Sequence, residues 1–254
     1  MHTIDLKNKG YRTDLVIDEI TREKDTKLSS KILEKTKNVT VEEVIIDEKT
    51  NCNKKKGIYE TISFTDITDK NNFKEVEELA IKTLKNMLNK LNISSNAKIL
   101  VVGLGNASST PDALGPKTLD HVLVTRHLFL LGDVEEGYRN VASFKPSVTG
   151  VTGIETKDLI EGIKEKIKPD ILIVIDALAS SSIERLNKTI QITSAGISPG
   201  SGVGNNRLEI SQDTLHIPVI AIGVPTVVDG ATIVENTLPV SYTHLRAHET
   251  ELHL

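Results

Sequence analysis

The pattern of hydrophobic and polar positions is clearest over residues 72–91, where apolar side chains recur every three or four residues. That spacing places them on one face and predicts a long amphipathic helix. Upstream, two short runs rich in β-branched residues, 39–46 and 58–64, flank a polar turn that contains Cys52. Two such runs around a polar turn predict a β-hairpin over residues 39–65.

Unbroken apolar runs at 98–102, 171–175 and 217–222 are too short for helices and typical of strands buried on both faces. Helical patterns at 112–130 and 156–167 lie between them. This alternation predicts an α/β fold with a mostly parallel central sheet flanked by helices on both faces, and with the hairpin as an N-terminal appendage. In such sheets, ligands and catalytic groups gather beyond the carboxyl ends of the strands.

The composition is that of an ordinary globular protein, with 254 residues, a net charge of −4 and 38% hydrophobic residues. The acidic balance and 3% aromatic content argue against nucleic-acid binding through phosphate contacts or base stacking. Cys52 is the only cysteine, which excludes an intrachain disulfide and a thiolate-rich zinc site. No segment approaches the roughly 20 apolar residues of a membrane span. We therefore expect a cytoplasmic protein without nucleic-acid or membrane partners.

The end of the chain, residues 239–254, holds three of the seven histidines and has no apolar period. It resembles the translated adapter sequence often found at the ends of genes predicted from metagenomes. We expect this segment to be an artefact that lies outside the fold, with a genuine histidine-containing tail as the alternative.

The first candidate for chemistry is a loop over 103–116, GLGNASSTPDALGP, directly after the first core strand. Ser108 stands where the dinucleotide fingerprint needs its third glycine, and no P-loop lysine follows. The end of the loop predicts a helix start instead, with Thr110 as N-cap, Pro111 at the first helical position and Asp112 in the first turn. Asp112 therefore either stabilises the helix dipole or is a functional group at the sheet edge.

The second candidate is Asp176, which follows the core strand 171–175. A carboxylate there can cap a helix over 177–187, or it can act together with Asp112. Parallel strands end at the same edge, so we expect both carboxyl groups to project there. If adjacent, they can share a proton, one acting as base toward water and the other as acid. The helix dipole favours the charged form of Asp112, which makes Asp176 the expected proton holder.

The third candidate is a glycine-dense loop over 192–207 that follows a short strand at 189–193. Its glycines allow the backbone to approach a ligand closely, so its amides can hold an extended substrate or an oxyanion. A phosphate cradle is the competing use, although no phosphate motif matches and only Arg207 is basic nearby. The residues expected in a substrate-binding or oxyanion loop, across this loop and the first, are Gly103, Gly105, Asn106, Gly200, Ser201, Gly202 and Gly204.

Histidine and serine chemistry fit the sequence less well. His121 and His127 lie six positions apart, so they do not share a helix face, and the zinc-peptidase motif HExxH is absent. Ser201 is the candidate nucleophile, but the GxSxG elbow is missing. Two alternatives stay open: a metal-dependent peptidase using Asp112, Asp176 and a histidine such as His127, and a non-peptidase nucleotide- or anion-binding module.

Several longer strings resemble the germination protease family of spore-forming bacteria. They are GLGN followed by TPDALGP, then TRHL, VIDALAS, SIERLNKTIQI and GISPGSGVGNNR, with RTDL and VTVEE nearer the N-terminus. The resemblance runs from about Tyr11 to Thr237. It implies an aspartic-type endopeptidase, with a fold similar to hydrogenase-maturation peptidases, that degrades small acid-soluble spore proteins during germination. It also implies a self-processing zymogen that works as a homotetramer in the spore core, without a metal or other cofactor.

The resemblance also implies roles for individual residues. The family's two key aspartates match Asp112 and Asp176, and its propeptide would end between Asp14 and Leu15. On this interpretation residues 1–14 are a propeptide-like segment, and 15–238 form a single peptidase domain that lacks the family's C-terminal segment.

Overall fold

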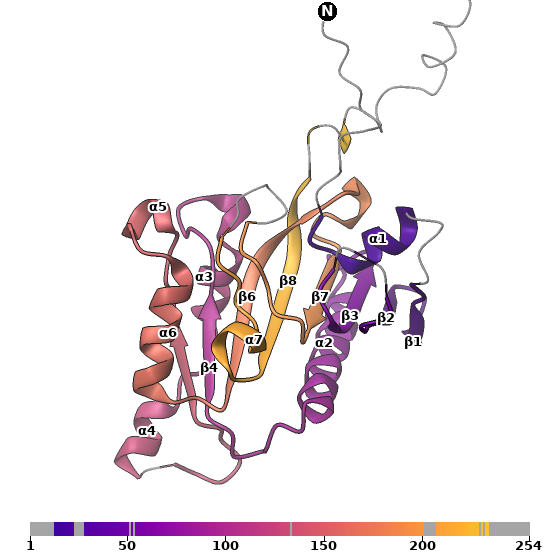
Figure 1. Ribbon diagram of the computed structural model, residues 1–254. Helices are drawn as coiled ribbons and strands as arrows, with labels where there is room; N and C mark the ends of the chain where they lie inside the picture. Colours follow the sequence, from indigo (N-terminus) through magenta and orange to yellow (C-terminus); the bar gives the residue numbers. More distant parts are fainter. Residues whose placement is uncertain are drawn as a thin grey trace, which may run out of the picture.

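The computed structural model describes residues 13–22, 28–50, 52, 54–132, 134–200, 207–228, 230 and 232–233. Its centre is an eight-stranded sheet with the order β1-β2-β3-β7-β8-β6-β4-β5 (Figure 1). The strands are β1 (Lys31–Lys35), β2 (Val39–Ile46), β3 (Gly57–Phe64), β4 (Ile99–Gly103), β5 (Val141–Phe144), β6 (Ile171–Ser180), β7 (Thr189–Thr193) and β8 (Val219–Val228). The proposed tail, 239–254, and residues 1–12 lie outside the described residues.

The sheet is mixed, which corrects the prediction of a mostly parallel one. β5, β4, β6 and β8 pair in parallel, whereas β1, β2, β3 and β7 pair antiparallel, as do β7 and β8. The predicted hairpin forms, with Val39 opposite Phe64 and Ile46 opposite Gly57. It is not an appendage, because β3 pairs with β7 in the same sheet. Four successive residues of β3 are buried, as expected for a strand inside the sheet, between β2 and β7, with both faces covered.

Helices cover both faces of the sheet, as predicted. α2 (Lys70–Lys90) and α3 (Leu114–Leu119) pack on one face, and α6 (Thr156–Ile167) and α7 (Gln212–Leu215) on the other. β6 contributes to both cores by alternation: Ile173 joins the α2 and α3 side, while Leu172 and Val174 join the α6 and α7 side. Within the described ranges, no helix is long and apolar enough to cross a bilayer.

The continuous helix predicted over 112–130 is wrong. The chain forms η1 (Thr110–Asp112), α3 and α4 (Arg126–Leu131) instead. Thr125 explains the break, because its buried hydroxyl donates to the carbonyl of Arg139 and accepts from the Val141 N–H at 3.0 Å. These contacts tie the chain to the start of β5 and end the helical run.

β6 is longer than the predicted strand 171–175 and continues to Ser180, so Asp176 lies inside a strand rather than after one. The extension forms because β8 runs beside it as far as Ser180 opposite Val228. The helix considered at 177–187 is absent from this described stretch, which holds only the single turn η2 (Ile183–Arg185) after the strand. The remaining helices are α1 (Val16–Arg22) and α5 (Thr149–Thr152).

Candidate active site

Asp112 and Asp176 line one cavity of about 410 Å³ beyond the carboxyl end of β4. We call it the carboxylate cavity. Its walls come from the loop after β4, the second half of β6, the residues leading into α5, and the end of β8. Its lining residues include Asp14, Gly105, Asp112, Asp176, Gly200 and Arg207.

Glycines let the backbone bring Asp112 to this cavity. Gly105 has φ +105°, and a Cβ there would lie 2.0 Å from the carbonyl oxygen of Asp112. A Cβ on Gly115 would lie 2.3 Å from the Leu104 carbonyl oxygen and 2.5 Å from that of Ile175. The loop can therefore fold back against η1, and α3 can start in contact with β4 and β6, only because these positions lack side chains.

The Asp112 carboxylate is held by the loop rather than by a long helix. It accepts the Asn106 N–H at 2.8 Å, and η1 is a single turn, so the predicted helix start with a Thr110 cap does not form. Partial burial raises the pKa of Asp112, while the Asn106 N–H opposes that rise because it favours the charged form.

Asp176 has a different environment. Its side chain points from the middle of β6, the residue is 5% exposed, and its carboxylate accepts the Ala177 N–H at 2.9 Å. Burial raises the pKa of Asp176 to about 8, the Ala177 N–H opposes this, and the negative charges of Asp112 and Asp14 add to it. At neutral pH Asp176 therefore holds a proton in this structure, which gives the two carboxyl groups different chemical capacities.

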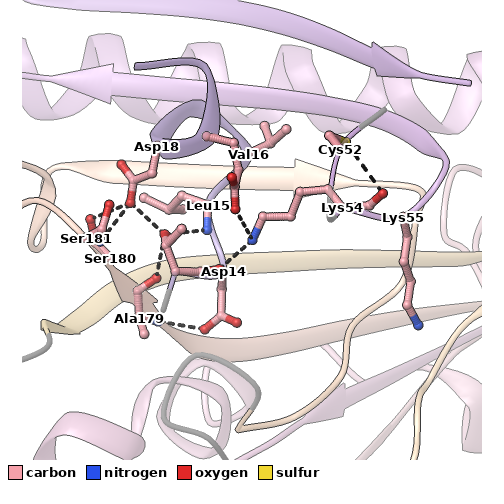
Figure 2. A network of polar contacts seen from close by, with 12 residues as sticks. Asp14, Leu15, Val16, Asp18, Cys52, Lys54, Lys55, Ala179, Ser180 and Ser181 are labelled. Atoms are coloured by element: carbon pink, nitrogen blue, oxygen red, sulfur yellow. Dashed lines mark hydrogen bonds and ion pairs between the residues drawn. The ribbon is translucent and has the colours of Figure 1, made fainter. Parts of the chain in front are cut away.

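A third carboxylate, that of Asp14, also lines the carboxylate cavity, which the sequence pattern did not indicate. The Asp14 N–H donates to the Ala179 carbonyl at 2.9 Å, and its carboxylate accepts the Ala179 N–H at 2.8 Å. Figure 2 shows this pairing, with the Asp14 side chain beside Ala179 at the end of β6. The two residues are 165 positions apart, so no local signal could have revealed the contact.

A second cavity of about 360 Å³ lies on the other side of Asp14, and we call it the lysine cavity. Lys54 Nζ donates to the Thr13 carbonyl at 2.5 Å and lies 4.0 Å from Glu19. The Gln191 side chain accepts the Val16 N–H at 2.8 Å and donates to the Asp14 carbonyl at 3.3 Å. Both side chains therefore hold the backbone around the Asp14–Leu15 bond.

The predicted substrate-binding residues have different places. Gly105 and Gly200 line the carboxylate cavity. Gly103 packs against α3, since a Cβ there would lie 2.4 Å from the Gly115 carbonyl oxygen, and the Asn106 N–H is taken by Asp112. Ser201, Gly202 and Gly204 lie outside the described residues.

His127 lies at the opposite edge of the sheet from Asp112. It is on α4, and the residue before that helix, Thr125, donates its N–H to Val141 at the amino end of β5. The ligand set of the metal-dependent alternative is therefore not brought together. In the described part of the chain, no group of three His, Cys, Asp or Glu side chains is placed to hold a metal ion.

Comparison of the sequence with known proteins identifies a family to which it is similar. The sequence matches the family described as germination protease over residues 12–252, a range that contains all three carboxylates of the cavity. The germination protease of Bacillus cytotoxicus is 45% identical over 254 positions, covering 95% of this chain and 69% of the relative. That of Priestia megaterium is 45% identical over 257 positions, covering 95% and 70%. That of a Geobacillus species is 53% identical over 195 positions, covering 75% and 52%.

Proposed function

We propose, from the premise that this chain belongs to the germination protease family of aspartic-type endopeptidases, that it degrades small acid-soluble spore proteins inside the germinating spore. The observation that supports its mechanism is the shared cavity of Asp112 and Asp176, in which the two carboxyl groups have unlike surroundings. One is half-buried with a backbone donor, and the other is buried and protonated at neutral pH.

In the proposed reaction Asp112 is the base and Asp176 the acid. Asp112 takes a proton from a water molecule, whose oxygen attacks the carbonyl carbon of the scissile peptide bond. Asp176 donates its proton to the carbonyl oxygen, so the tetrahedral intermediate carries no full negative charge. The proton held by Asp112 then passes to the leaving nitrogen, and Asp176 recovers its own proton as the carbonyl re-forms.

Glycine backbone in the cavity wall would align the substrate. We assign Gly105 and Gly200 to substrate binding, together with Ser201, Gly202 and Gly204 of the same loop as Gly200. Gly103 and Asn106 support the site instead, because their contacts hold α3 and Asp112. Peptide groups that line a cavity can pair with an extended substrate, which suits an endopeptidase.

We also propose that the chain is a zymogen, cleaved by its own active site between Asp14 and Leu15. Asp14 occupies one wall of the carboxylate cavity and adds a second negative charge, next to that of Asp112, beside the protonated Asp176. Release of residues 1–14 would open that wall and remove the charge. A homotetramer is the assembly expected for this family and is part of the same proposal.

The test is incubation with a small acid-soluble spore protein, with fragments identified by mass spectrometry. Asp112→Asn and Asp176→Asn should each lower turnover by about 10³-fold or more, because Asn keeps the shape but can act neither as base nor as acid. Asp158→Asn is the matched control, since Asp158 is exposed in the first turn of α6. Retained activity in either active-site variant would refute the mechanism, and so would loss of activity with a chelator.

Self-processing needs a separate test. The full chain should yield a product that begins at Leu15, and the Asp176→Asn chain should not, unless active enzyme is added. Equal processing of both chains would mean that a contaminating protease makes the cut.

A further inference from the structure

We propose that Asp18 is the binding site for the α-ammonium group that cleavage between Asp14 and Leu15 creates. The inference rests on the proposed function, because it concerns the product of self-processing. In it, Asp18 is a positioning residue that fixes the new N-terminus against the strand carrying Asp176.

The new N-terminus would begin inside the protein. Leu15 and Val16 are both 0% exposed, and Ile17 is 5% exposed. Leu15 and Ile17 pack with Leu178 of β6, while Val16 belongs to a separate cluster with Tyr59. These contacts do not depend on residues 1–14, so Leu15 should stay buried after the cut. An ammonium group buried without a partner costs several kcal/mol, so the processed protein needs an acceptor here.

Thr13 shows which acceptor is within reach. Its hydroxyl accepts the Leu15 N–H at 3.1 Å and donates to Asp18 Oδ2 at 2.6 Å. The Leu15 nitrogen and the Asp18 carboxylate are thus linked by two hydrogen bonds that meet at one hydroxyl, on a side chain that cleavage removes. The same cut takes the acceptor from Leu15 and a donor from Asp18, and an ammonium group restores both contacts.

Asp18 is fixed in place to receive it. It is 2% exposed, and Oδ2 also accepts the Ser180 hydroxyl at 3.1 Å and the Ser181 N–H at 2.8 Å. Arg185 Nε donates to Oδ1 at 2.8 Å. Figure 2 shows the Asp18 carboxylate facing Ser180 and Ser181 at the end of β6. The carboxylate therefore needs no rearrangement to gain a cation on its Oδ2 side.

A second acceptor lies beside the first. The Ala179 carbonyl receives the Asp14 N–H at 2.9 Å and the Thr13 hydroxyl at 3.4 Å, and cleavage removes both donors. An ammonium group has enough donors for the Asp18 carboxylate and this carbonyl together. Among the residues that the structure describes, the other charged groups near the segment are Arg185, Lys54 and Glu19, and Lys54 keeps Glu19 as its partner after Thr13 is lost.

The ion pair would connect maturation to the active site. Ala179 and Ser180 are the last residues of β6, and Asp176 lies in the same strand. Before the cut, Thr13 and Asp14 hold this end of the strand through hydrogen bonds to Ala179. After the cut, the Leu15 ammonium takes over that role while the Asp14 carboxylate leaves the cavity.

The direct test uses a chain produced to begin at Leu15, so that it does not depend on self-cleavage. Its α-amino group is titrated by NMR with labelled leucine. We expect its pKa to rise to about 9 or above, from the usual range of about 7.7–8.0. Asp18→Asn should return the pKa to that range or below, whereas Glu19→Gln should leave it raised. An ordinary pKa in the unsubstituted chain, or an equal fall in both variants, would overturn the proposal.

A second variant covers the case in which Asp18→Asn fails to fold. One extra glycine before Leu15 keeps Asp18 and all its present partners but moves the ammonium group away. This chain should show an ordinary α-amino pKa and a lower melting temperature than the chain beginning at Leu15. Equal melting temperatures and equal pKa values would also overturn the proposal.

The proposed ion pair also predicts the direction in which the stability of the processed chain changes with pH. A group with a raised folded pKa contributes stability that is present below its unfolded pKa and is lost as pH rises through the folded pKa. The chain beginning at Leu15 should therefore lose stability between pH 8 and about pH 10 relative to its glycine-extended form. No difference between the two curves in that window would contradict the ion pair. Because these chains need no self-cleavage, a failure here leaves the proposed peptidase activity standing, and a failure of self-cleavage leaves this result unaffected.

Discussion

The two cavities on either side of Asp14 differ in how they hold charge. In the carboxylate cavity, the Asp112 and Asp176 side chains accept only backbone N–H groups among their identified hydrogen bonds. In the lysine cavity, Lys54 pairs with Glu19 and Lys55 with Glu209. Their volumes are similar, at about 410 and 360 Å³. The two cavities therefore do not differ in size. They differ in whether their charged side chains are paired with a side chain of opposite charge.

The difference indicates which cavity is suited to chemistry. Carboxyl groups without a cationic partner keep raised pKa values, and such groups can exchange protons near neutral pH. Charged side chains that are already paired interact less strongly with a substrate. In the lysine cavity, Lys54 and Gln191 instead form hydrogen bonds with the chain's own backbone. Under the proposed function, the carboxylate cavity is the site of catalysis, and the lysine cavity anchors the N-terminal segment.

The largest effect expected from this comparison concerns glycine packing. Gly115→Ala would place a Cβ against two backbone oxygens that cannot move cheaply, and should cost about 3 kcal/mol or more. Gly223, which lines the lysine cavity, would place its Cβ 2.4 Å from the Leu178 side chain, so Gly223→Ala should cost less. Thermal unfolding of both variants measures the difference.

Gly162→Ala is the matched control for these two variants. Gly162 lies in α6 with nothing within 4 Å of an added Cβ, so the change should stabilise the protein by about 0.5–1 kcal/mol. A Gly223→Ala variant less stable than Gly115→Ala would mean that the lysine cavity is the more tightly built one.

The next effect is on the pH dependence of turnover. Ionisation of Asp176 removes the proposed acid, so kcat should fall about tenfold per pH unit above an alkaline limb near pH 8. Asp14 contributes to the raised pKa of Asp176, so its release with residues 1–14 should move the limb of the processed enzyme below about pH 8. Rates of peptide cleavage between pH 5 and about pH 10 test this. A rate that is flat to pH 10 would exclude Asp176 as the acid.

A smaller effect should appear in stability. The folded protein holds the Asp176 proton up to about pH 8, while the unfolded chain releases it near its ordinary pKa, so Asp176 lowers stability progressively as pH rises through that window. Asp176→Asn removes this penalty and should stabilise the protein at pH 8 by about 1 kcal/mol or more, raising Tm by a few degrees, with a smaller gain at pH 4. Asp158→Asn should show no such trend. Equal gains at both pH values would contradict the raised pKa.

The smallest effect belongs to the lysine cavity. Burial lowers the pKa of Lys54, although Asp14, Glu19 and Asp18 oppose this, so Lys54 contributes stability that increases with pH in the alkaline range. Lys54→Met should remove that slope and change stability at pH 7 by less than about 1 kcal/mol, since a lost hydrogen bond is offset by cheaper burial. Lys55→Met, which alters a more exposed pair, should leave the slope intact. Loss of peptidase activity in Lys54→Met comparable to that of Asp176→Asn would break the distinction between the cavities.

Much of the fold was predictable wherever the spacing of apolar residues along the sequence matches that of a helix or a strand. The local pattern of apolar and polar residues predicts four parts of the fold: the buried face of α2, the hairpin of β2 and β3, the strand β7 and the helix α6. The failures have one physical cause, which is a partner far away in the sequence. β6 extends beyond Ile175 because β8 lies beside it, and the helix after Asp112 ends early because Thr125 bonds to the start of β5.

The site divides in the same way. Asp112 and Asp176 were predictable candidates, because each follows a recognisable buried strand run, and their presence in one cavity then depends on the pairing of β4 with β6. Asp14 in the cavity and Thr13 between Leu15 and Asp18 were not predictable. Their positions depend on Ala179, Ser180 and Gln191, and nothing in a short polar segment encodes such distant partners.

The close approach of Gly103 to Gly115 has a consequence for saturation mutagenesis of this protein. A scan that scores only survival of function would rank these glycines beside Asp112, although they contact α3 and β4 rather than a substrate. Substitutions of the glycines and of Asp112 would be equally harmful, but the first would disrupt packing and the second would remove a catalytic group. Measuring cellular abundance in parallel separates the two groups, since glycine variants should disappear from the soluble pool while Asp112→Asn accumulates at normal levels.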